Sequence, residues 1–401
     1  MQSELIYVLA FCLVVYALLS RPLGSSIISG PTFFMLSGML VGPAGLKLIH
    51  IDIDDGVLEL FAEFTLGLIL FADAATTDTR KLFRNPGLPE RLLLIALPLT
   101  IGLGTIFALI MFPGLTWPQA GLIAAILAPT DAALGLAVVK STKVPERLRR
   151  AILVESGLND GLALPAVLFF AALSFSMSGE TDMKTTQWLW FALSQIGIGI
   201  FTGLALGGLC GWLVSRANEI GFIDHNFKGL IAIAVAVLSL ISAEHIGGNS
   251  FIAAFVAGLV FGRLQKAEAE HLIEFIEEEG QLLSLIVFFL FGAVLLPHAY
   301  EYFTVFCFLY AIFSLTVIRM VPTIIAMSKS GTQMEDKLFV GWFGPRGLAS
   351  ILFLLIAVEH SEGIELPRVE AVVYITVFLS VILHGASANY LSGWIEKRQP
   401  S

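Results

Sequence analysis

The sequence predicts an all-α membrane protein that crosses the bilayer about 13 times. Of the 401 residues, 57% are hydrophobic and only 14% are charged, which is outside the usual composition of soluble globular domains. Apolar runs of about twenty residues recur along the whole chain, whereas a membrane β-barrel would show alternating segments of about ten residues. We therefore expect one transmembrane domain over residues 1–401.

The apolar runs place the expected helices in order. The first run lacks the basic start of a signal peptide, since Glu4 is the only charged residue before it, so we interpret it as an uncleaved span. With about twenty residues per span, we predict helices near 4–20, 24–46, 57–76, 91–113, 117–139, 148–177, 187–215, 227–245, 249–262, 272–296, 302–327, 336–358 and 369–394.

The basic residues predict the orientation of these spans. With the N-terminus outside, 18 of the 23 Lys and Arg residues fall in inside loops and three fall outside. This asymmetry is what the positive-inside rule expects. We therefore expect a multi-pass protein of the plasma (inner) membrane with an outside N-terminus and a cytoplasmic C-terminus. A net charge of −9 gives no reason to expect a nucleic-acid partner.

Two expected spans, the fifth and the twelfth, carry a proline at mid-membrane, at Pro129 and Pro345. A proline removes a helix hydrogen bond and frees carbonyl groups. In hydrocarbon, such groups are tolerated only where they line a cavity or find a partner. The two spans are an odd number of crossings apart and so run in opposite directions. Interrupted helices at matching positions of inverted repeats indicate a transport site.

Polar and charged side chains gather beside these interruptions. On the sixth span, Glu155 and Asn159 are four residues apart, as are Ser156 and Asp160, so each pair shares a helix face. Carboxylate, amide and hydroxyl oxygens suit Na⁺ or another small hard cation better than a soft transition metal. Ionised carboxylates such as Asp131 and Asp160 cost about 3 kcal/mol or more within a membrane and mark ion or proton pathways.

Two arginines, Arg319 and Arg346, lie inside the eleventh and twelfth spans. A lone arginine there would be as costly as a lone aspartate, so we expect each to face a carboxylate. The three carboxylates Glu155, Asp131 and Asp160 would then leave one acid without a permanent partner.

Three strings identify a family resemblance: Ala128-Pro-Thr-Asp-Ala132, Glu155-Ser-Gly-Leu-Asn-Asp-Gly161 and Gly344-Pro-Arg-Gly347. They resemble the NhaP-type cation/proton antiporters, relatives of the animal sodium/proton exchangers, and the resemblance covers essentially the whole chain. It implies exchange of Na⁺, or of Li⁺ or K⁺, for H⁺, with roles in pH homeostasis and salt tolerance and no cofactor. It also implies a homodimer, with a moving core over roughly 91–177 and 302–394 and the other spans as scaffold and dimer interface.

The resemblance also implies which residues bind the ions. Asp160 resembles the carboxylate for which H⁺ and Na⁺ compete, and Ser156 and the main-chain carbonyl of Thr130 resemble further Na⁺ ligands. Glu155 would act directly or through water, and Asp131 would shape the cavity.

Three further residues have supporting roles by the same resemblance. Asn159 occupies the position where electrogenic relatives carry a second aspartate, which implies electroneutral one-for-one exchange. Arg319 resembles the counter-ion of Glu155. Arg346 resembles the cation that closes the crossing of the two interrupted helices.

Other readings remain for parts of this pattern. An intramembrane aspartyl protease also uses two membrane aspartates, but its Gly-x-Gly-Asp string is absent from the sequence, and we do not expect an enzyme. A K⁺ efflux channel or transporter of the wider superfamily is the main alternative. Such relatives usually add a cytosolic nucleotide-binding domain, which we do not expect after the last apolar run. We interpret Asp73 as a solvated helix end, with a funnel-lining charge that attracts cations as the alternative, and His384 as a packing contact.

Overall fold

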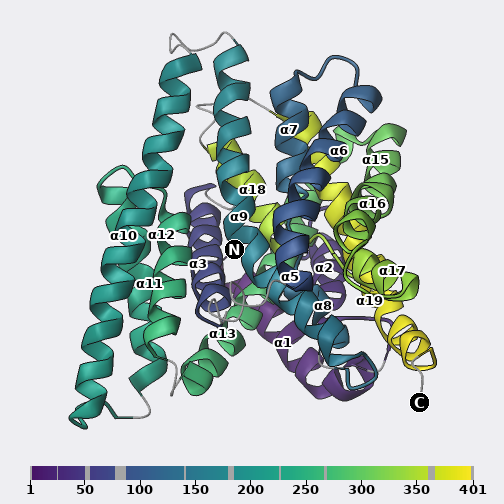
Figure 1. The fold of residues 1–401 in the computed structure, drawn as a ribbon. Coiled ribbons are helices and arrows are strands. Elements are labelled where there is room, and N and C mark those ends of the chain that lie inside the picture. The colour runs from purple at the N-terminus through teal and green to yellow at the C-terminus, as the bar shows by residue number, and fades with distance from the viewer. Residues whose placement is uncertain are drawn as a thin grey trace. The chain divides into compact units, whose positions relative to one another are not determined.

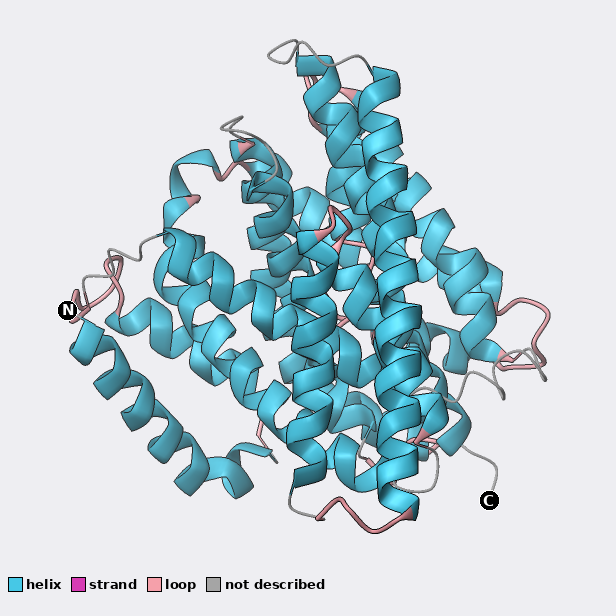
Figure 2. Cartoon of the chain, turned by 90° about the vertical axis from the view of Figure 1, so that its left-hand side faces the viewer, coloured by secondary structure: helices cyan, strands magenta, loops and turns pink. Residues whose placement is uncertain are grey.

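The computed structural model describes residues 2–24, 26–49, 55–76, 87–139, 141–178, 185–224, 227–265, 269–359 and 366–398. The regular structure of these ranges is entirely helical (Figure 2), which confirms the predicted all-α class. Contacts between the helices divide the chain into two compact units. The first comprises 1–58, 87–156 and 284–401, and the second comprises 59–86 and 157–283.

The helices of both units can be followed in Figure 1. In chain order the helices of the first unit are α1 (Gln2–Gly24), α2 (Gly30–Val41), α5 (Leu88–Arg91), the π-helical turn η1 (Leu92–Ala96), α6 (Leu97–Met111), α7 (Trp117–Ile126), α8 (Ala132–Val139), the π-helical turn η3 (Phe291–Leu295), α14 (Leu296–His298), the 3-10 turn η4 (Tyr300–Tyr302), α15 (Val305–Leu315), α16 (Val317–Ala326), α17 (Met334–Trp342), α18 (Leu348–Glu359) and α19 (Pro367–Glu396). The second unit holds most of α3 (Asp55–Thr76), α10 (Thr185–Glu219), α11 (Lys228–His245), α12 (Ser250–Leu264) and most of α13 (Ala269–Leu290). α9 (Glu146–Ser178) runs unbroken from the first unit into the second.

The two predicted interruptions are confirmed. The fifth expected span divides into α7 and α8, and the twelfth divides into α17 and α18. A further break was not predicted: the expected helix over 302–327 divides at Thr316 into α15 and α16, and no proline or glycine stands at the break. The π-helical turns η1 and η3 inside the fourth and tenth expected spans were also not predicted.

The start of α2 differs from the predicted range 24–46. The helix begins at Gly30 because the side chain of Ser29 accepts a hydrogen bond from the Thr32 amide and Pro31 occupies the first turn. Both features are typical of a helix N-terminus. It ends at Val41, and Lys47, just after the turn at 43–46, adopts a positive φ of 54°.

Small residues let helices of the second unit approach closely. Gly203 and Gly207 of α10 face main-chain atoms of α12, Gly199 faces the carbonyl of Asn249 just before α12, and a Cβ at any of them would collide. Gly258 and Gly262 of α12 meet main-chain carbonyls of α3 in the same way. Helices associate in membranes by such close packing of small residues. α12 therefore packs between α10 and α3.

The first unit has a buried apolar cluster where several helices end. Leu92 of η1, Leu148 of α9, Ala326 of α16, Phe339 of α17 and Ala388 of α19 all belong to it. The cluster packs the end of α16 against the middle of α17. It therefore holds α17 in place next to the interruption at 343–347.

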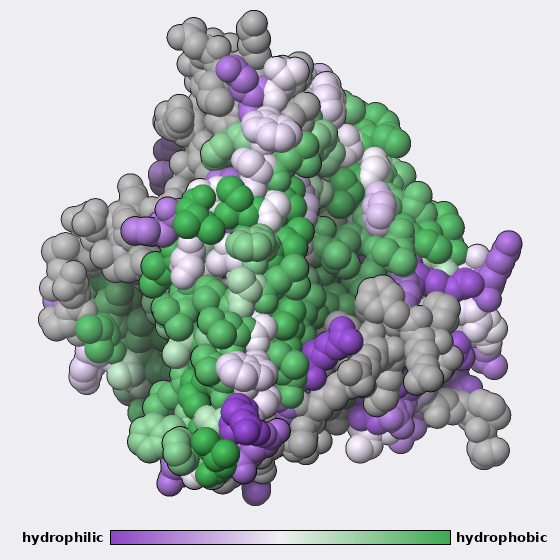
Figure 3. Space-filling model, turned by 60° about the vertical axis from the view of Figure 1, so that its left-hand side comes forward, coloured by the Kyte–Doolittle hydropathy of each residue, from purple (hydrophilic) through white to green (hydrophobic). Residues whose placement is uncertain are grey.

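Seven helices of the described ranges are long and apolar enough to cross a membrane, and four shorter apolar helices accompany them. Large apolar side chains such as Phe201, Leu204 and Trp212 are exposed on α10, and hydrophobic residues dominate the face shown in Figure 3. The count of 13 crossings and the orientation remain predictions. Several loops that carry the basic residues of that prediction, including 77–86 and 266–268, lie outside the described residues.

Candidate functional site

The two interrupted helices cross in the first unit, and Asp131 ties them together. Its main-chain N–H donates to the Pro345 carbonyl at 2.8 Å. Its carboxylate accepts from the Leu348 amide at 2.8 Å and from the Leu134 amide at 3.3 Å. These amides lie in the first turns of α18 and α8, where N–H groups lack helical partners and the helix dipole favours an anion. One carboxylate therefore caps two half-helices.

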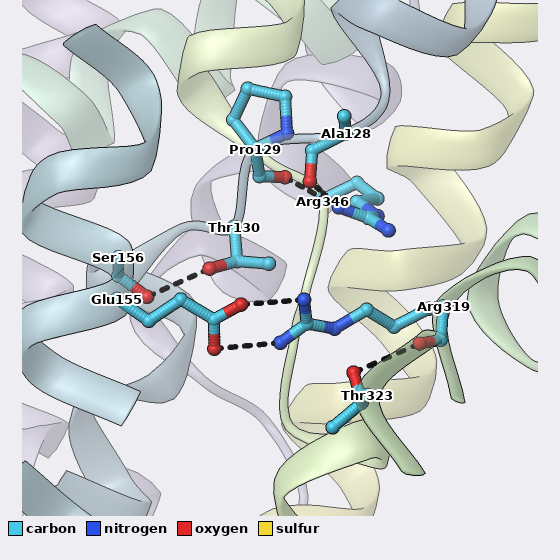
Figure 4. A network of polar contacts seen from close by, with 8 residues as sticks. All are labelled: Ala128, Pro129, Thr130, Glu155, Ser156, Arg319, Thr323 and Arg346. Carbon is cyan, nitrogen blue, oxygen red and sulfur yellow. Dashed lines mark hydrogen bonds and ion pairs between the residues drawn. The ribbon is translucent and has the colours of Figure 1, made fainter. Parts of the chain in front are cut away.

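Arg346 binds the opposite kind of helix end. Its Nη1 donates to the carbonyls of Ala128 and Pro129, the latter at 2.8 Å, just beyond the C-terminus of α7 (Figure 4). Ser350 adds a hydroxyl donor to the Ile126 carbonyl at 2.8 Å. The expectation that each buried arginine faces a carboxylate is wrong for Arg346. Carbonyls at a helix C-terminus carry partial negative charge and provide the acceptors instead.

Glu155 and Arg319 form a buried, two-pronged ion pair. Arg319 Nη1 lies 2.6 Å from Glu155 Oε1 and Nη2 lies 2.8 Å from Oε2 (Figure 4). The Glu155 side chain is 3% exposed and the Arg319 side chain is 2% exposed. The predicted contact between them is confirmed. Parallel N–H···O⁻ bonds of this kind fix orientation as well as charge.

Two glycines bring the interruption at 343–347 against these charges. A Cβ on Gly344 would collide with the Arg319 guanidinium, and a Cβ on Gly347 would collide with the Asp131 carboxylate. The backbone can approach both charged groups only because these residues lack side chains. The Gly344-Pro-Arg-Gly347 string therefore combines close backbone approach with a break in the helix.

Hydroxyl groups lie beside the crossing. Thr130 Oγ1 and Ser156 Oγ are 2.9 Å apart and both side chains are buried (Figure 4). Asn159 and Asp160 are also buried, and both lie further along α9, in the part that belongs to the second unit. Because α9 is continuous there, Asp160 lies one turn beyond Ser156 on the same helix face. Within the first unit, the structure thus brings together the two arginines and the residues Thr130, Asp131, Glu155 and Ser156.

Ser350 and Ser380 also contact the crossing and were not predicted from the sequence. Ser380 of α19 accepts a hydrogen bond from the Arg346 amide at 2.7 Å. Polar residues on otherwise apolar helices were the available signal, but the sequence does not show which neighbour they meet. Among the described residues, no group of three or more His, Cys, Asp or Glu side chains could hold a metal ion.

Comparisons with known proteins match most of the length of this chain. The family model described as "Sodium/hydrogen exchanger, transmembrane" matches residues 8–392. A K⁺/H⁺ antiporter NhaP from Alkalimonas amylolytica is 23% identical over 392 residues, which cover 96% of this chain and 65% of that protein. A Na⁺/H⁺ antiporter from Schizosaccharomyces pombe is 23% identical over 397 residues, which cover 90% of this chain and 83% of that protein. The chain therefore spans less than two thirds of the first relative's length.

A solved structure also matches over nearly the whole chain. The sodium proton antiporter MjNhaP1 from Methanocaldococcus jannaschii, solved at pH 8, gives a TM-score of 0.79 at 19% sequence identity. The match covers 99% of this chain and 97% of that one. This likeness establishes that the two chains share a fold.

Proposed function

The chain belongs to the sodium/hydrogen exchanger family, and we propose on that basis that it exchanges a monovalent cation for H⁺ by alternating access. The observation that carries the proposal is the crossing of two interrupted helices beside the buried Glu155, Ser156 and Thr130. Oxygen-bearing side chains at such a crossing suit the binding of a small hard cation. Membrane carboxylates also suit proton transfer.

We propose that cation and proton compete for Asp160, with Ser156 and the Thr130 carbonyl as further Na⁺ ligands. Glu155 would act directly or through water, while its pairing with Arg319 holds it in place. Asp131 and Arg346 would keep the crossing in shape. An empty, ionised carboxylate is expensive to move through a dry region. Only the site occupied by a proton or a cation therefore crosses, which makes the exchange obligatory.

The remaining assignments extend this proposal to the whole protein. We propose a homodimer in the plasma membrane, with an outside N-terminus and a cytoplasmic C-terminus. A core over roughly 91–177 and 302–394 would move against the other spans. Exchange of this kind would serve pH homeostasis and salt tolerance.

The direct test of the function is a ΔpH assay in everted vesicles. Adding NaCl, LiCl or KCl in turn should release H⁺ from an acidified lumen and restore the fluorescence of a ΔpH dye. The relatives are named for K⁺ and for Na⁺, so the series also ranks the cations. A K⁺ channel would collapse the membrane potential and leave ΔpH intact. No response to any alkali cation would refute the proposal.

We expect the exchange to be electroneutral. Asn159 does not titrate, so it cannot carry a second proton beside Asp160. Na⁺-driven H⁺ movement in proteoliposomes should keep the same initial rate when valinomycin and a K⁺ gradient impose a potential. Equal K⁺ on both sides with valinomycin is the matched control at zero potential. A rate that rises severalfold with potential would show that net charge moves.

Competition at one carboxylate predicts how the apparent KM for Na⁺ depends on pH. Below the pKa of the site, raising the pH by one unit should lower KM about tenfold, because each proton must leave before Na⁺ binds. Above that pKa, KM should be constant. The maximal rate should fall at both extremes of pH, where one of the two substrates becomes scarce. A KM independent of pH would mean that separate sites bind the two ions.

Two variants refine this measurement. Ser156→Ala removes a proposed side-chain ligand and should raise KM for Na⁺ while leaving the pH of the break in the profile unchanged. Thr130→Ala should change the profile little, because the proposed ligand is the main-chain carbonyl, whereas the substitution removes the hydroxyl that contacts Ser156.

A further inference from the structure

Two side chains of α19 face both ends of the interruption between α17 and α18. Ser380 and His384 are four residues apart and buried. Ser380 Oγ accepts from the Arg346 amide at 2.7 Å, just before α18 begins. His384 Nε2 lies 2.8 Å from the Trp342 carbonyl, on the last residue of α17. The two contacts therefore hold the segment 343–347 from both sides.

The contacts of the imidazole limit where its hydrogens can lie. A carbonyl oxygen only accepts, so the contact with Trp342 requires a hydrogen on Nε2. Nδ1 either accepts from the Ser380 hydroxyl or, where it also carries a hydrogen, donates to the Ser380 carbonyl. Nδ1 lies 3.2 Å from Ser380 Oγ and 2.9 Å from the Ser380 carbonyl. Ser380 Oγ accepts from the Arg346 amide, and its own hydrogen remains available to donate to a neighbouring acceptor. The Ser380 hydroxyl and the His384 ring thus connect Arg346, just before α18, with Trp342, at the end of α17.

Two further contacts join the Trp342 side chain to α19. Its ring lies against the His384 ring, with centroids 5.1 Å apart and planes tilted by 33°. Its indole N–H donates to Ser387 Oγ at 2.9 Å. The end of α17 is thus fixed by its main chain, its ring face and its ring nitrogen.

A broken helix needs such contacts inside a membrane. The last carbonyls of α17 and the first amides of α18 have no helical partners, and there is no bulk water at that depth to satisfy them. Ser380 and His384 provide one acceptor and one donor in the required places.

We propose that His384, acting with Ser380, is a positioning residue of the transport site. This inference rests on the proposed function, because its consequence is a change in cation affinity. Arg346 reaches the Ala128 and Pro129 carbonyls, and the Pro345 carbonyl accepts from the Asp131 amide. A shift of the segment 343–347 therefore passes to residues 128–131, which include the proposed cation ligand.

Matched variants separate positioning from the mere filling of space. His384→Leu fills much of the ring's volume but removes the donor to Trp342, whereas His384→Gln can place an amide N–H near the position of Nε2. Ser380→Ala removes the acceptor for Arg346. Ser392→Ala is the control, because Ser392 is also buried on α19 and its hydroxyl has no hydrogen-bond partner among the described residues.

The first readout is the apparent KM for the transported cation in proteoliposomes. His384→Leu and Ser380→Ala should raise KM about fivefold, as loss of one hydrogen bond predicts. His384→Gln should recover most of the affinity, and Ser392→Ala should match wild type. A KM within twofold of wild type in both His384→Leu and Ser380→Ala would overturn the proposal.

The second readout does not need transport. In the purified protein, amide hydrogen exchange of the peptide that covers 343–348 should be about tenfold faster in Ser380→Ala and His384→Leu. Ser392→Ala and His384→Gln should leave it unchanged. If wild type transports no alkali cation, the proposed function fails and this exchange rate alone decides on positioning. Equal exchange in Ser380→Ala and wild type would overturn positioning even if His384→Leu does not fold.

Discussion

Asp160→Asn is expected to abolish cation/proton exchange without preventing insertion into the membrane. Asparagine keeps the shape of aspartate but neither titrates nor offers a negative charge. With no proton to exchange and a weaker site for the cation, the variant cannot complete either half of the cycle. The measurement is cation-driven recovery of ΔpH-dye fluorescence in everted vesicles that contain equal amounts of wild-type and variant protein.

The control for this change is Asp73→Asn. It makes the same substitution at another carboxylate of an apolar helix, near the end of α3. We expect this variant to keep most of the wild-type response, because we assign Asp73 no part in the ion site. Asp160→Asn activity above about a tenth of wild type in well-expressed protein, a loss of less than about 1.4 kcal/mol in transition-state terms, would remove Asp160 from the mechanism.

Breaking the ion pair between Glu155 and Arg319 should have the largest effect on stability. Both side chains are almost completely buried, so removing one leaves the other charge uncompensated. Such a loss costs about 3–5 kcal/mol, whereas removing both partners costs far less. Glu155→Ala and Arg319→Ala should each lower the folded yield and the thermal stability more than the double variant does.

The exposed pair Arg216–Glu219 provides the comparison for that experiment. Its atoms are also close, at 2.7 Å, but its side chains are 65% and 63% exposed. Exposed pairs contribute at most about 1 kcal/mol. Its double-mutant cycle should therefore show almost no coupling, whereas the buried pair should show strong coupling. Strict additivity at Glu155 and Arg319 would contradict the importance of their contact.

The sequence predicted the interruptions because proline acts on the backbone wherever it stands in a helix. Pro129 and Pro345 lack the amide that a continuous helix needs, so the break could be expected without knowledge of the tertiary structure. The break at Thr316 carries no such signal. It became visible only in three dimensions, as did the π-helical turns.

The sequence indicated which charged residues lie beside the interruptions, but it did not indicate all of the groups that they contact. Counting charges predicted that Arg319 faces a carboxylate, and the family resemblance implied Glu155 as that partner, which the structure confirms. The same counting failed for Arg346, whose acceptors are main-chain carbonyls that every residue possesses. The double capping by Asp131 was hidden for the same reason, because amide groups of two half-helices leave no mark in the sequence.

The reliance of the crossing on main-chain groups has a consequence for how this site can diverge among homologues. Ala128 contributes only a carbonyl oxygen to the crossing, and a residue with a different side chain can deliver the same atom. Asp131 contributes a side-chain carboxylate, which only glutamate also carries, on a longer side chain. Gly344 and Gly347 contribute the absence of a side chain, which no other residue type provides. We therefore expect evolutionary drift to be freest at positions that contribute only a carbonyl acceptor and most restricted at Asp131, Gly344 and Gly347. The crossing can keep its geometry while much of the sequence around it changes.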